Sequence, residues 1–537
     1  MSRGAPAGDS FDYIVVGAGS AGAIVAARLS EDGRYRVLVV EAGGWDRNPW
    51  LHIPLGVGKT IMNPAVNWCY RTEPQAELMG REIYMARGKV IGGTHAINGL
   101  LHIRGAREDY DGWARDGATG WSWNEVLPYF KRSEDHYRGD SDLHATGGPV
   151  AVGRPEGPSP LCESFVQAAL NWGLPPNEDF CSGHQEGAGR YDMNVRRGLR
   201  SNSAKGALHP ARRRPNLAVR VRALVHRVVF QGRRAAGIEV IGADGRPQLL
   251  RAAREIVLCA GAINTPPLLM RSGIGPRAEL DRHGIAVLAD RAQVGSCLQD
   301  HVTVRVVCRT REPITLNDDL RSPWRRMRMG LRYAVSRSGP LAFASGQAGM
   351  FFRSDDALPL ADAQAFLMPL SVPAVGQMPH RFSAFSVSVM QSWPESRGQV
   401  RLLDANPATP PLIDPNYLSA PGDRAFFLRA LPKLRAMLAT RPMDTIIASE
   451  FQPGESVRSP EDLMAFVRQK AATISHPCGS CRMGSDGESV VDPQLRVREV
   501  EGLRIADASV FPRITSGNIN ATCLMIGEKA SDLIQQS

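Results

Sequence analysis

The sequence has no uninterrupted apolar run near the roughly 18 residues that a membrane-spanning helix requires. Its nine cysteines are odd in number and scattered, without the paired spacing of a disulfide-rich secreted protein. The first ten residues, MSRGAPAGDS, contain no apolar segment of a secretory signal. Together these absences favour a cytoplasmic protein with no transmembrane segment.

Acidic residues are outnumbered by basic ones, which gives a formal net charge of +10, and aromatic residues make up only 7% of the chain. Much of the basic excess is arginine, clustered for example at residues 196–200 and 212–214. Nucleic-acid-binding proteins combine such clusters with interleaved aromatic residues or a recognised motif. Neither accompanies these clusters, so we expect a solvated basic face and no nucleic-acid partner.

Residues 11–44, FDYIVVGAGSAGAIVAARLSEDGRYRVLVVEAGG, organise the rest of the chain. An apolar run at 13–16 predicts a strand, a glycine-rich turn and a small-residue helix follow, and a second strand at 37–40 ends at Glu41. Glycines let the backbone approach a pyrophosphate, the helix N-terminus stabilises its charge, and the acid hydrogen-bonds a ribose hydroxyl. This order predicts a βαβ unit that binds a dinucleotide. The alternative is a helix packed on a strand through small residues.

Two further stretches carry signals of the same kind. In residues 84–105 closely spaced glycines interrupt a run that is too polar for a core strand, and they allow backbone N–H groups to crowd against an anion or a ring system. The apolar run 256–260 ends in Gly-Ala ahead of a predicted helix. Residues 45–74, which directly follow the first stretch, predict an irregular excursion, either a flap over the cofactor or plain loop packing.

The remaining segments suggest a second lobe. At 537 residues the chain exceeds the usual size of a single core. Residues 382–390 and 399–403 predict strands between proline-rich turns. Residues 324–337, WRRMRMGLRYAVSR, are basic and amphipathic; we favour a surface helix over a membrane-surface segment because Gly330 interrupts it and no second anchor is visible.

With these motifs in place, the sequence resembles the glucose-methanol-choline (GMC) oxidoreductases, flavoproteins that oxidise alcohols. The resemblance covers essentially the whole chain and is strongest to the bacterial choline dehydrogenase-like and sorbose dehydrogenase-like branch. It rests on four motifs in order: GAGSAG with its downstream EAG, the glycine stretch at 88–98, GAINTPPLLMRSGIG at 261–275, and HPCGSCRMG with DASVFP and SGNIN near the end.

The resemblance implies an α/β fold with FAD as cofactor rather than NAD. The Rossmann-like FAD domain is expected to be discontinuous, with an inserted substrate domain on a largely antiparallel sheet. Its implied segments are 10–45, 84–155, 215–308 and 465–537, with a flap at 46–83 and substrate-binding segments at 156–214 and 309–464. The oligomeric state is left open.

The cofactor-binding residues that the resemblance implies come from all of these signal-bearing stretches. The ADP half is assigned to the first stretch, flavin and pyrophosphate contacts to the second, and Val225 faces the adenine through its backbone. They are Gly17, Gly19, Ser20, Ala21, Gly22, Glu41, Ala42, Arg87, Gly88, Val90, Gly92, Gly93, Asn98, Gly99, Leu100, Val225, Ala260, Asp507, Ala508, Asn520 and Thr522.

The implied catalytic pair is His476 and Asn518. Oxidation of an alcohol removes a hydroxyl proton and a hydride, and imidazole is the side chain best suited to take that proton near neutral pH. An amide hydrogen-bonds the alcohol oxygen without competing as a base. The structural alternatives are a core histidine and a helix cap. We expect oxidation of a primary alcohol or polyol hydroxyl, with electrons passed to a quinone or other carrier, or to O₂ in an oxidase.

Two other functions remain open: a hydroxynitrile-lyase-type activity, and a flavin-binding relative without catalysis.

Two residues depart from the family pattern. His95 stands where relatives usually have Ser, Thr or Gly, but the family's covalent flavin attachment aligns with Ile97, so we expect non-covalent FAD. Cys478 replaces a commoner valine and forms a Cys-x-x-Cys pair with Cys481. We expect no metal site there, because ligands are too few.

Overall fold

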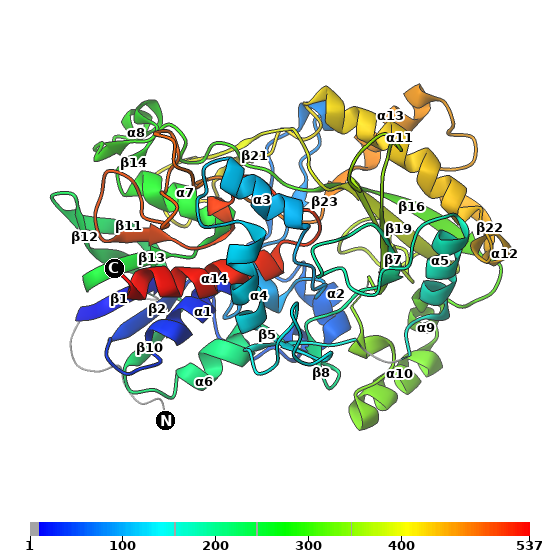
Figure 1. The fold of residues 1–537 in the computed structure, drawn as a ribbon, viewed down its shortest axis with the longest axis horizontal. Coiled ribbons are helices and arrows are strands. Elements are labelled where there is room, and N and C mark those ends of the chain that lie inside the picture. Colours follow the sequence, from blue (N-terminus) through cyan, green and yellow to red (C-terminus); the bar gives the residue numbers. More distant parts are fainter. Residues whose placement is uncertain (1–9, 155–156, 243–244, 345) are drawn as a thin grey trace.

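The structure, a computed structural model, describes residues 10–154, 157–242, 245–344 and 346–537. The expectation for the first residues and the predicted domain border at 155/156 therefore lie outside the described residues. Two sheets dominate the fold (Figure 1). Within the described part of the chain, none of the helices combines the length and apolar character needed to cross a bilayer.

The first sheet is mostly parallel and begins with the predicted βαβ unit. Its parallel strands lie in the order β10-β2-β1-β13, β24 pairs with β13, and β12 and β11 extend the sheet antiparallel. Residues 13–16 of β1, 37–40 of β2 and 256–258 of β13 are apolar and buried, as expected where helices cover a parallel sheet. The strands are β1 (Ser10–Val16), β2 (Val37–Glu41), β10 (Leu217–Val221), β11 (Leu224–Gln231), β12 (Arg234–Ile241), β13 (Pro247–Leu258) and β24 (Leu503–Ile505).

The two ends of the chain meet in this lobe. Helix α1 (Ser20–Leu29) packs along helix α14 (Asn520–Gln535), which in turn packs on α4 (Trp123–Ser133) (Figure 1). A Cβ at Gly527 would lie 2.8 Å from the Ala21 carbonyl oxygen, so the small residues allow this close crossing. Further helices of the lobe are α3 (Arg107–Arg115), α6 (His209–Ala211), α7 (Gly261–Arg271) and α8 (Arg277–Arg282).

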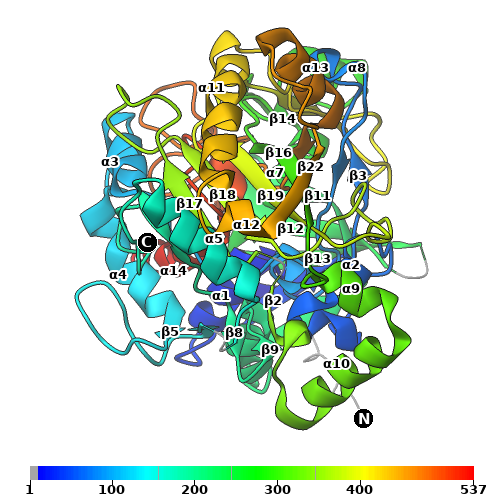
Figure 2. The ribbon, with the colours of Figure 1, turned by 90° about the vertical axis from the view of Figure 1, so that its right-hand side faces the viewer.

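The second sheet is antiparallel, as predicted, in the order β22-β16-β19-β18-β17-β7, with β23 paired to β16. Helices α5 and α11 pack on it through Phe165, Phe426 and Phe427 (Figure 2). Its elements are β7 (Gly187–Arg190), β16 (Val302–Thr310), β17 (Ala348–Phe352), β18 (Ala363–Met368), β19 (Ala384–Gln391), β22 (Ile447–Gln452), β23 (Ala472–Thr473), α5 (Pro160–Asn171), α11 (Pro421–Leu438), α12 (Met443–Ile446) and α13 (Pro460–Lys470).

The remaining helices are α2 (Val57–Thr60), α9 (Leu316–Arg321) and α10 (Pro323–Ser336). The remaining strands form pairs: β3 (Tyr70–Arg71) with β4 (Tyr84–Met85), β5 (Glu134–His136) with β6 (Val150–Val152), β8 (Val195–Arg196) with β9 (Leu199–Arg200), β14 (Ile274–Gly275) with β15 (Ala289–Asp290), and β20 (Gln399–Arg401) with β21 (Leu412–Asp414).

Three local expectations differ from the structure. The pattern of residues 216–229 predicts one strand, but the structure has two there, β10 and β11, separated at Arg222, which has a positive φ of 57°. Strand β16 begins at Val302, so the expected border at 309 cuts through it. Gly330 does not interrupt its helix, because α10 runs continuously over 14 residues. Glycine lowers helix stability by about 1 kcal/mol without forcing a break.

Candidate active site

A cavity of about 500 Å³ receives residues from both lobes. The first lobe contributes the ends of β1 and β2 and the turn before α7, and the second contributes Phe366 of β18. The structure brings most of the predicted site residues to this one cavity: Gly17, Gly19, Ser20, Ala21, Glu41, Ala42, Arg87, Gly88, Gly93, Asn98, Gly99, Leu100, Val225, Ala260, Asp507, Ala508, Asn520, His476 and Asn518.

The two glycine-rich turns touch at the cavity wall. A Cβ at Gly93 would lie 2.7 Å from the Cα of Gly19, and one at Gly17, which has a φ of +102°, would lie 2.4 Å from the Cys259 carbonyl oxygen. Real Cβ atoms do not approach backbone so closely, and a positive φ favours glycine. These glycines therefore set the backbone close to the cavity.

The N-terminus of α1 opens at this wall. Gly19 is its N-cap, and glycine has no side chain that could cap the first N–H groups. Ser20 and Ala21 of the first turn line the cavity. The first N–H groups of a helix have no partner within the helix and carry its positive dipole end. This is an anion site of the kind that holds a pyrophosphate.

Glu41 is buried at the end of β2, and its carboxylate accepts the Ala18 N–H at 2.9 Å and the Gly43 N–H at 2.8 Å. Burial raises the pKa of Glu41, while these two backbone donors act in the opposite direction. Both bonds hold the carboxylate at the cavity wall, where its remaining lone pairs suit a hydroxyl donor.

Two amide side chains in the cavity wall have buried atoms without a hydrogen-bond partner among the described residues. They are Nδ2 of Asn520 and Oδ1 of Asn518. The Asn520 Oδ1 atom accepts a hydrogen bond from the Ser20 hydroxyl at 2.8 Å, which fixes the direction of its amide. Because buried polar atoms are normally satisfied, these two point to a polar ligand. The glycine cradle, the helix N-terminus and these atoms together fit a dinucleotide.

Four predicted cofactor residues do not line the cavity and lie behind it. The Gly92 N–H bonds the Ala18 carbonyl at 2.8 Å, and a Cβ at Gly22 would lie 2.0 Å from the Gly17 carbonyl oxygen. Val90 pairs with Gly44, and the Thr522 hydroxyl pairs with Tyr110 at 2.8 Å. These residues support the wall by packing and hydrogen bonding, which a motif in the sequence does not separate from contact with a ligand.

His476 is held from two sides. Its backbone N–H donates to Oδ1 of Asp300 at 2.7 Å, and its Nδ1 lies 3.0 Å from Nδ1 of His301. The second carboxylate oxygen of Asp300 accepts the Tyr417 hydroxyl at 2.5 Å and the Thr473 hydroxyl. Burial lowers the pKa of His476 well below its ordinary value, and His301 and Arg87 lower it further. At neutral pH its imidazole is therefore uncharged.

The partners of His301 determine which nitrogen of His476 is basic. Nε2 of His301 lies 3.0 Å from the Ser392 carbonyl oxygen, which only accepts, so this nitrogen carries a proton. Burial lowers the pKa of His301 to about 4, so its Nδ1 is an acceptor. His476 must then donate from Nδ1, which leaves the lone pair on Nε2.

Asn518 completes the pair. Its Nδ2 lies 3.2 Å from Nε2 of His476, so an amide donor faces the basic nitrogen at the cavity wall. This arrangement suits an alcohol whose hydroxyl hydrogen points to His476 Nε2 and whose oxygen accepts from the amide. His476 and Asn518 were predicted from the sequence. Asp300 and His301 were not, although they stand together in the stretch Gln-Asp-His at 299–301.

Other cavity-lining residues were also missed. They include Val57, Ile61, Trp68 and Tyr70 of the predicted flap, residues 407–411, Phe366 and Arg271. The Tyr70 hydroxyl donates to Oδ1 of Asn264 at 2.7 Å, which ties this segment to the start of α7. The aromatic residues of the predicted flap were a sequence signal from which this contribution to the cavity could have been predicted. Residues 407–411 are joined to the cavity only by the tertiary fold.

The two residues that depart from the family pattern take no part in the cavity lining. His95 is buried, its Nδ1 accepts the Ser203 N–H at 3.3 Å, and burial beside Arg200 lowers its pKa to about 3. Cys478 and Cys481 are free, buried thiols, and burial raises the pKa of both above the ordinary range. Such thiols are poor nucleophiles and poor metal ligands.

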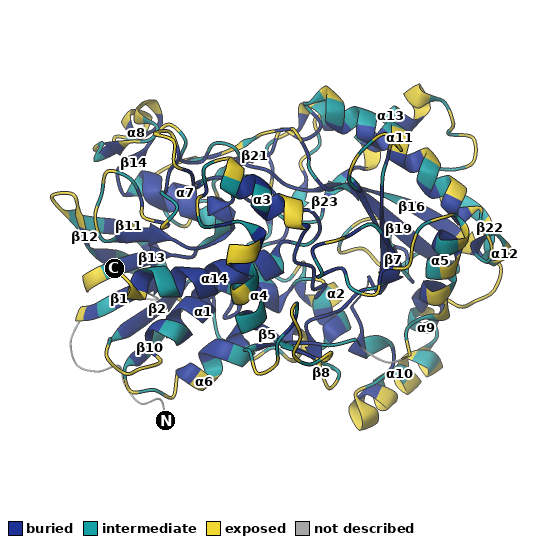
Figure 3. Cartoon of the chain, in the orientation of Figure 1, coloured by how far each residue is buried: buried dark blue, intermediate teal, exposed yellow. Residues whose placement is uncertain are grey.

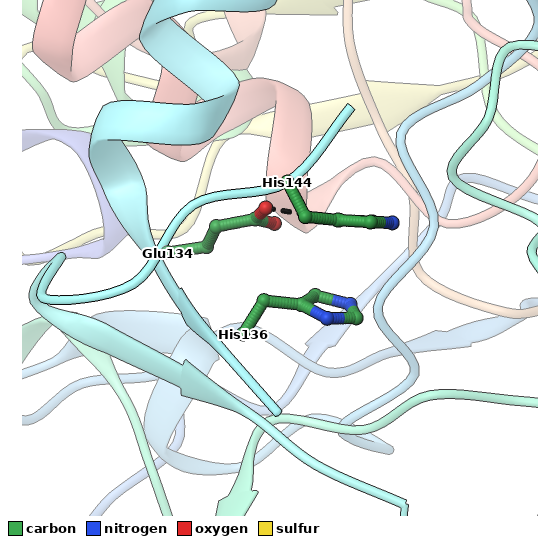
Figure 4. Close-up of side chains that lie close together, drawn as sticks. All are labelled: Glu134, His136 and His144. Atoms are coloured by element: carbon green, nitrogen blue, oxygen red, sulfur yellow. Dashed lines mark hydrogen bonds and ion pairs between the residues drawn. The ribbon is translucent and has the colours of Figure 1, made fainter. Parts of the chain in front are cut away.

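A second polar cluster lies outside the cavity (Figure 4). Glu134, His136 and His144 form the one group with metal-ligand spacing that the described residues contain. The two imidazoles are stacked, with ring centroids 3.7 Å apart and planes 23° apart, so their lone pairs do not converge. Arg104 also lies 2.7 Å from Glu134, and its charge opposes a cation. The geometry is that of a buried ion-pair network.

Comparisons with known proteins agree with this site. Family models described as GMC oxidoreductase match residues 11–303 and 394–527. The chain is 38% identical over 525 residues to oxygen-dependent choline dehydrogenase of Brucella anthropi, covering 97% of this chain and 95% of that protein. It is 39% identical over 543 residues to human mitochondrial choline dehydrogenase, covering 99% and 91%.

Solved structures show the same fold. Pyridoxine 4-oxidase from Mesorbium loti superposes with a TM-score of 0.88 at 32% identity, covering 98% of this chain and 99% of that one. Formate oxidase superposes with a TM-score of 0.92 at 27% identity, covering 100% and 99%. Fold and site thus define an FAD-dependent enzyme that acts on alcohol CH–OH groups. The chain belongs to the GMC oxidoreductase family.

Proposed function

We propose that this protein oxidises an uncharged primary alcohol or polyol hydroxyl to the carbonyl, with His476 as the general base and Asn518 as its partner. The observation that carries this proposal is the array His301–His476–Asn518, which leaves the Nε2 lone pair of His476 at the cavity wall. Bound FAD supplies the acceptor for the hydride at its N5.

The chain's own residues supply the remaining chemistry. His476 Nε2 takes the hydroxyl proton, and the Asn518 amide hydrogen-bonds the alcohol oxygen as it gains negative charge. Arg87, half-buried beside His476, donates to the Ser475 carbonyl at 2.7 Å and keeps positive charge near the developing alkoxide. The glycine turns, the α1 N-terminus, Glu41 and Asn520 would hold the cofactor.

The cavity wall favours an uncharged substrate. Glu41 and Asp507 are the only carboxylates among the described lining residues, and both are bonded to backbone N–H groups. The face of Trp68 already carries the Lys89 ammonium 4.4 Å from the ring centroid. A quaternary ammonium is held best by a carboxylate or by several free aromatic faces. Among the described lining residues Trp68 and Tyr70 stack on each other, with ring centroids 5.7 Å apart, which leaves Phe366 as the single further Phe, Tyr or Trp side chain. We therefore expect choline to be a poor substrate, although relatives carry its name.

Anaerobic reduction of the flavin by a panel of alcohols tests this proposal. Choline and its neutral carbon isostere form the decisive pair, because they differ in charge and hardly in shape. We expect the isostere to reduce the flavin with the higher second-order rate constant. A preference for choline would contradict the charge argument, and reduction by no alcohol would favour a lyase or a flavin-binding protein without catalysis.

We also propose that FAD is bound without a covalent link. In support, His95 does not line the cavity, and Ile97, which does, has no nucleophile. Acid precipitation should therefore leave a yellow supernatant over a colourless pellet. A yellow pellet would overturn the proposal.

For the electron acceptor we propose a quinone or other carrier rather than O₂. The support is the higher identity to human mitochondrial choline dehydrogenase, 39%, than to pyridoxine 4-oxidase, 32%. The Brucella relative at 38% identity is named oxygen-dependent and favours the alternative, O₂. Anaerobically reduced enzyme should be reoxidised slowly by air and rapidly by a quinone; rapid reoxidation by air would make it an oxidase. We also retain as proposals the predicted domain division, apart from the border at 309 inside β16, and a cytoplasmic location, the latter supported by nine free cysteines.

A further inference from the structure

Helix α10 turns its apolar stripe toward solvent. Trp324, Met327, Leu331 and Val335 are 68%, 55%, 64% and 79% exposed. They are spaced by three, four and four residues, which places them on one face of the helix. Figure 3 shows exposed residues along much of the helix. In a globular protein such a face normally packs on the core.

The opposite face holds α10 to the protein. Tyr333 is its only buried residue; its hydroxyl donates to the Gly198 carbonyl at 2.8 Å, and its ring packs with Ala342, Phe343 and Ile53. At about 100° per residue, Tyr333 points away from the stripe. The helix is thus anchored through one side and leaves the apolar side uncovered by any described residue of this chain.

The surroundings of the stripe are basic. The helix contains no acidic residue, and its one neighbouring acid with a short ion pair is Asp319, 3.6 Å from Arg325. Long arginine side chains can lie along an apolar surface and extend their charge toward phosphate groups. At about 100° per residue, Arg325, Arg328 and Arg332 flank the stripe on one side. Arg326 lies on the Tyr333 face, and Arg337 lies over the Tyr333 ring, 5.3 Å from its centroid.

The helix also lies beside the segment that reaches the cavity. Ile53, which packs against Tyr333, directly precedes the turn Pro54–Gly56 and helix α2. Val57 and Ile61 of that segment line the cavity. In both views α10 projects from one edge of the molecule (Figures 1 and 2). A surface bound to α10 would therefore face the flap side of the cavity.

We propose that α10 docks the enzyme on an anionic lipid bilayer, with the stripe at the boundary between head groups and acyl chains and the arginines on lipid phosphates. Its apolar stripe, with arginines beside it and no acidic residue in the helix, suits a helix that lies in the interface plane. Charge complementarity selects this occupant. A second copy packed symmetrically on the stripe would bring the three flanking arginines of each chain together and repel them, whereas anionic lipids attract them.

Vesicle flotation with the purified holoenzyme tests the proposal. The probes are vesicles of phosphatidylcholine alone and of phosphatidylcholine with phosphatidylglycerol. We expect flotation only with the anionic vesicles, weakened by high salt. The double variant Leu331→Gln and Val335→Gln should lower the vesicle partition coefficient about tenfold or more. The control is Leu249→Gln, which changes a 37% exposed leucine of β13 in the first sheet. This variant should leave the partition coefficient unchanged.

Soluble-alcohol turnover should be the same in all three proteins, because none of these residues lines the cavity. The proposal is overturned if the wild type does not float with anionic vesicles, or if the double variant floats as well as the wild type. It is also overturned if the double variant changes only the oligomeric state in size-exclusion chromatography, since the stripe would then cover a second copy.

Discussion

Nδ1 of His301 lies 3.0 Å from Nδ1 of His476, and two neutral imidazoles can meet in this way only when one donates and the other accepts. The Ser392 carbonyl determines which ring donates. It accepts a hydrogen bond from Nε2 of His301, so Nδ1 of His301 is left as the acceptor. His476 is thereby held in the tautomer whose basic nitrogen faces Asn518.

Replacement of His301 by leucine tests this positioning role. The substitution would leave Nδ1–H of His476 without its acceptor, so the ring can take the other tautomer. For His301→Leu we expect turnover to fall about 10- to 100-fold with FAD still bound. His301→Gln, whose amide oxygen can accept the same hydrogen bond, should recover part of the loss. Equal activity in His301→Leu and the wild type would contradict the tautomer argument.

The pH dependence of flavin reduction follows from the pKa of His476. Burial, His301 and Arg87 lower this pKa well below 6.5, so the uncharged base persists as the pH falls through 6.5. The second-order rate constant for flavin reduction should stay flat from neutral pH to below 6.5 and fall only at more acidic pH. An acidic limb centred at or above 6.5 would show that the imidazole is charged where we infer that it is neutral.

Glu134 stabilises the fold through its buried partners. It lies 2.7 Å from Arg104, both side chains are fully buried, and His144 also bonds it at 3.0 Å. Glu134→Gln leaves Arg104 without its counter-charge, so the free energy of unfolding should fall by about 3–5 kcal/mol. Urea denaturation measures this. Glu178→Gln breaks an ion pair in which the glutamate is 80% exposed, and it should cost under about 1 kcal/mol.

Burial alone would raise the pKa of Glu134, but Arg104, His102 and His144 hold it well below its ordinary value of 4.5. The carboxylate therefore contributes stability above pH 4.5, and this stability is lost as the pH falls below that value toward the depressed pKa. Below pH 4.5 the wild type should lose more stability than Glu134→Gln. The same acid sensitivity in both proteins would contradict the assignment of charge to this carboxylate.

Gly93 tests the contact between the two glycine turns. A Cβ at this position would lie 2.7 Å from the Cα of Gly19, which is backbone and cannot rotate away, and the φ of +53° disfavours other residues. Gly93→Ala should therefore purify with most of its FAD missing, as measured by the ratio of flavin to protein absorbance. Gly58→Ala, where a Cβ meets open space, is the matched control and should retain FAD. Full flavin content in both variants would contradict the close-contact account.

Periodicity and motifs predicted the parts of this fold that are local in sequence. The βαβ unit, the strand before α7 and the closing helix α14 all have patterns within a few residues of one another. The motifs also predicted which stretches meet at the cavity. They did not separate Ser20, which lines the cavity, from Thr522, which bonds Tyr110 behind it, because both roles select small polar residues.

What the sequence could not supply depends on contacts between distant residues. His301 acts through His476, 175 positions away, and Tyr417 acts through Asp300, 117 positions away. Strand β16 was divided by a predicted border because an apolar run does not state which sheet it joins. The sequence also could not predict whether the apolar stripe of α10 packs on the protein or faces solvent. Helical periodicity defines an apolar face but not the surface that this face contacts.

The central claim is that His476 is the base in an alcohol oxidation at bound FAD, and single-turnover reduction of the flavin tests it most directly. Wild type and His476→Ala, both loaded with FAD, are mixed anaerobically with the best alcohol substrate, and the loss of oxidised-flavin absorbance is followed. We predict that His476→Ala keeps its flavin and reduces it about 10²–10⁴-fold more slowly. Reduction at a near-normal rate in His476→Ala would contradict the claim.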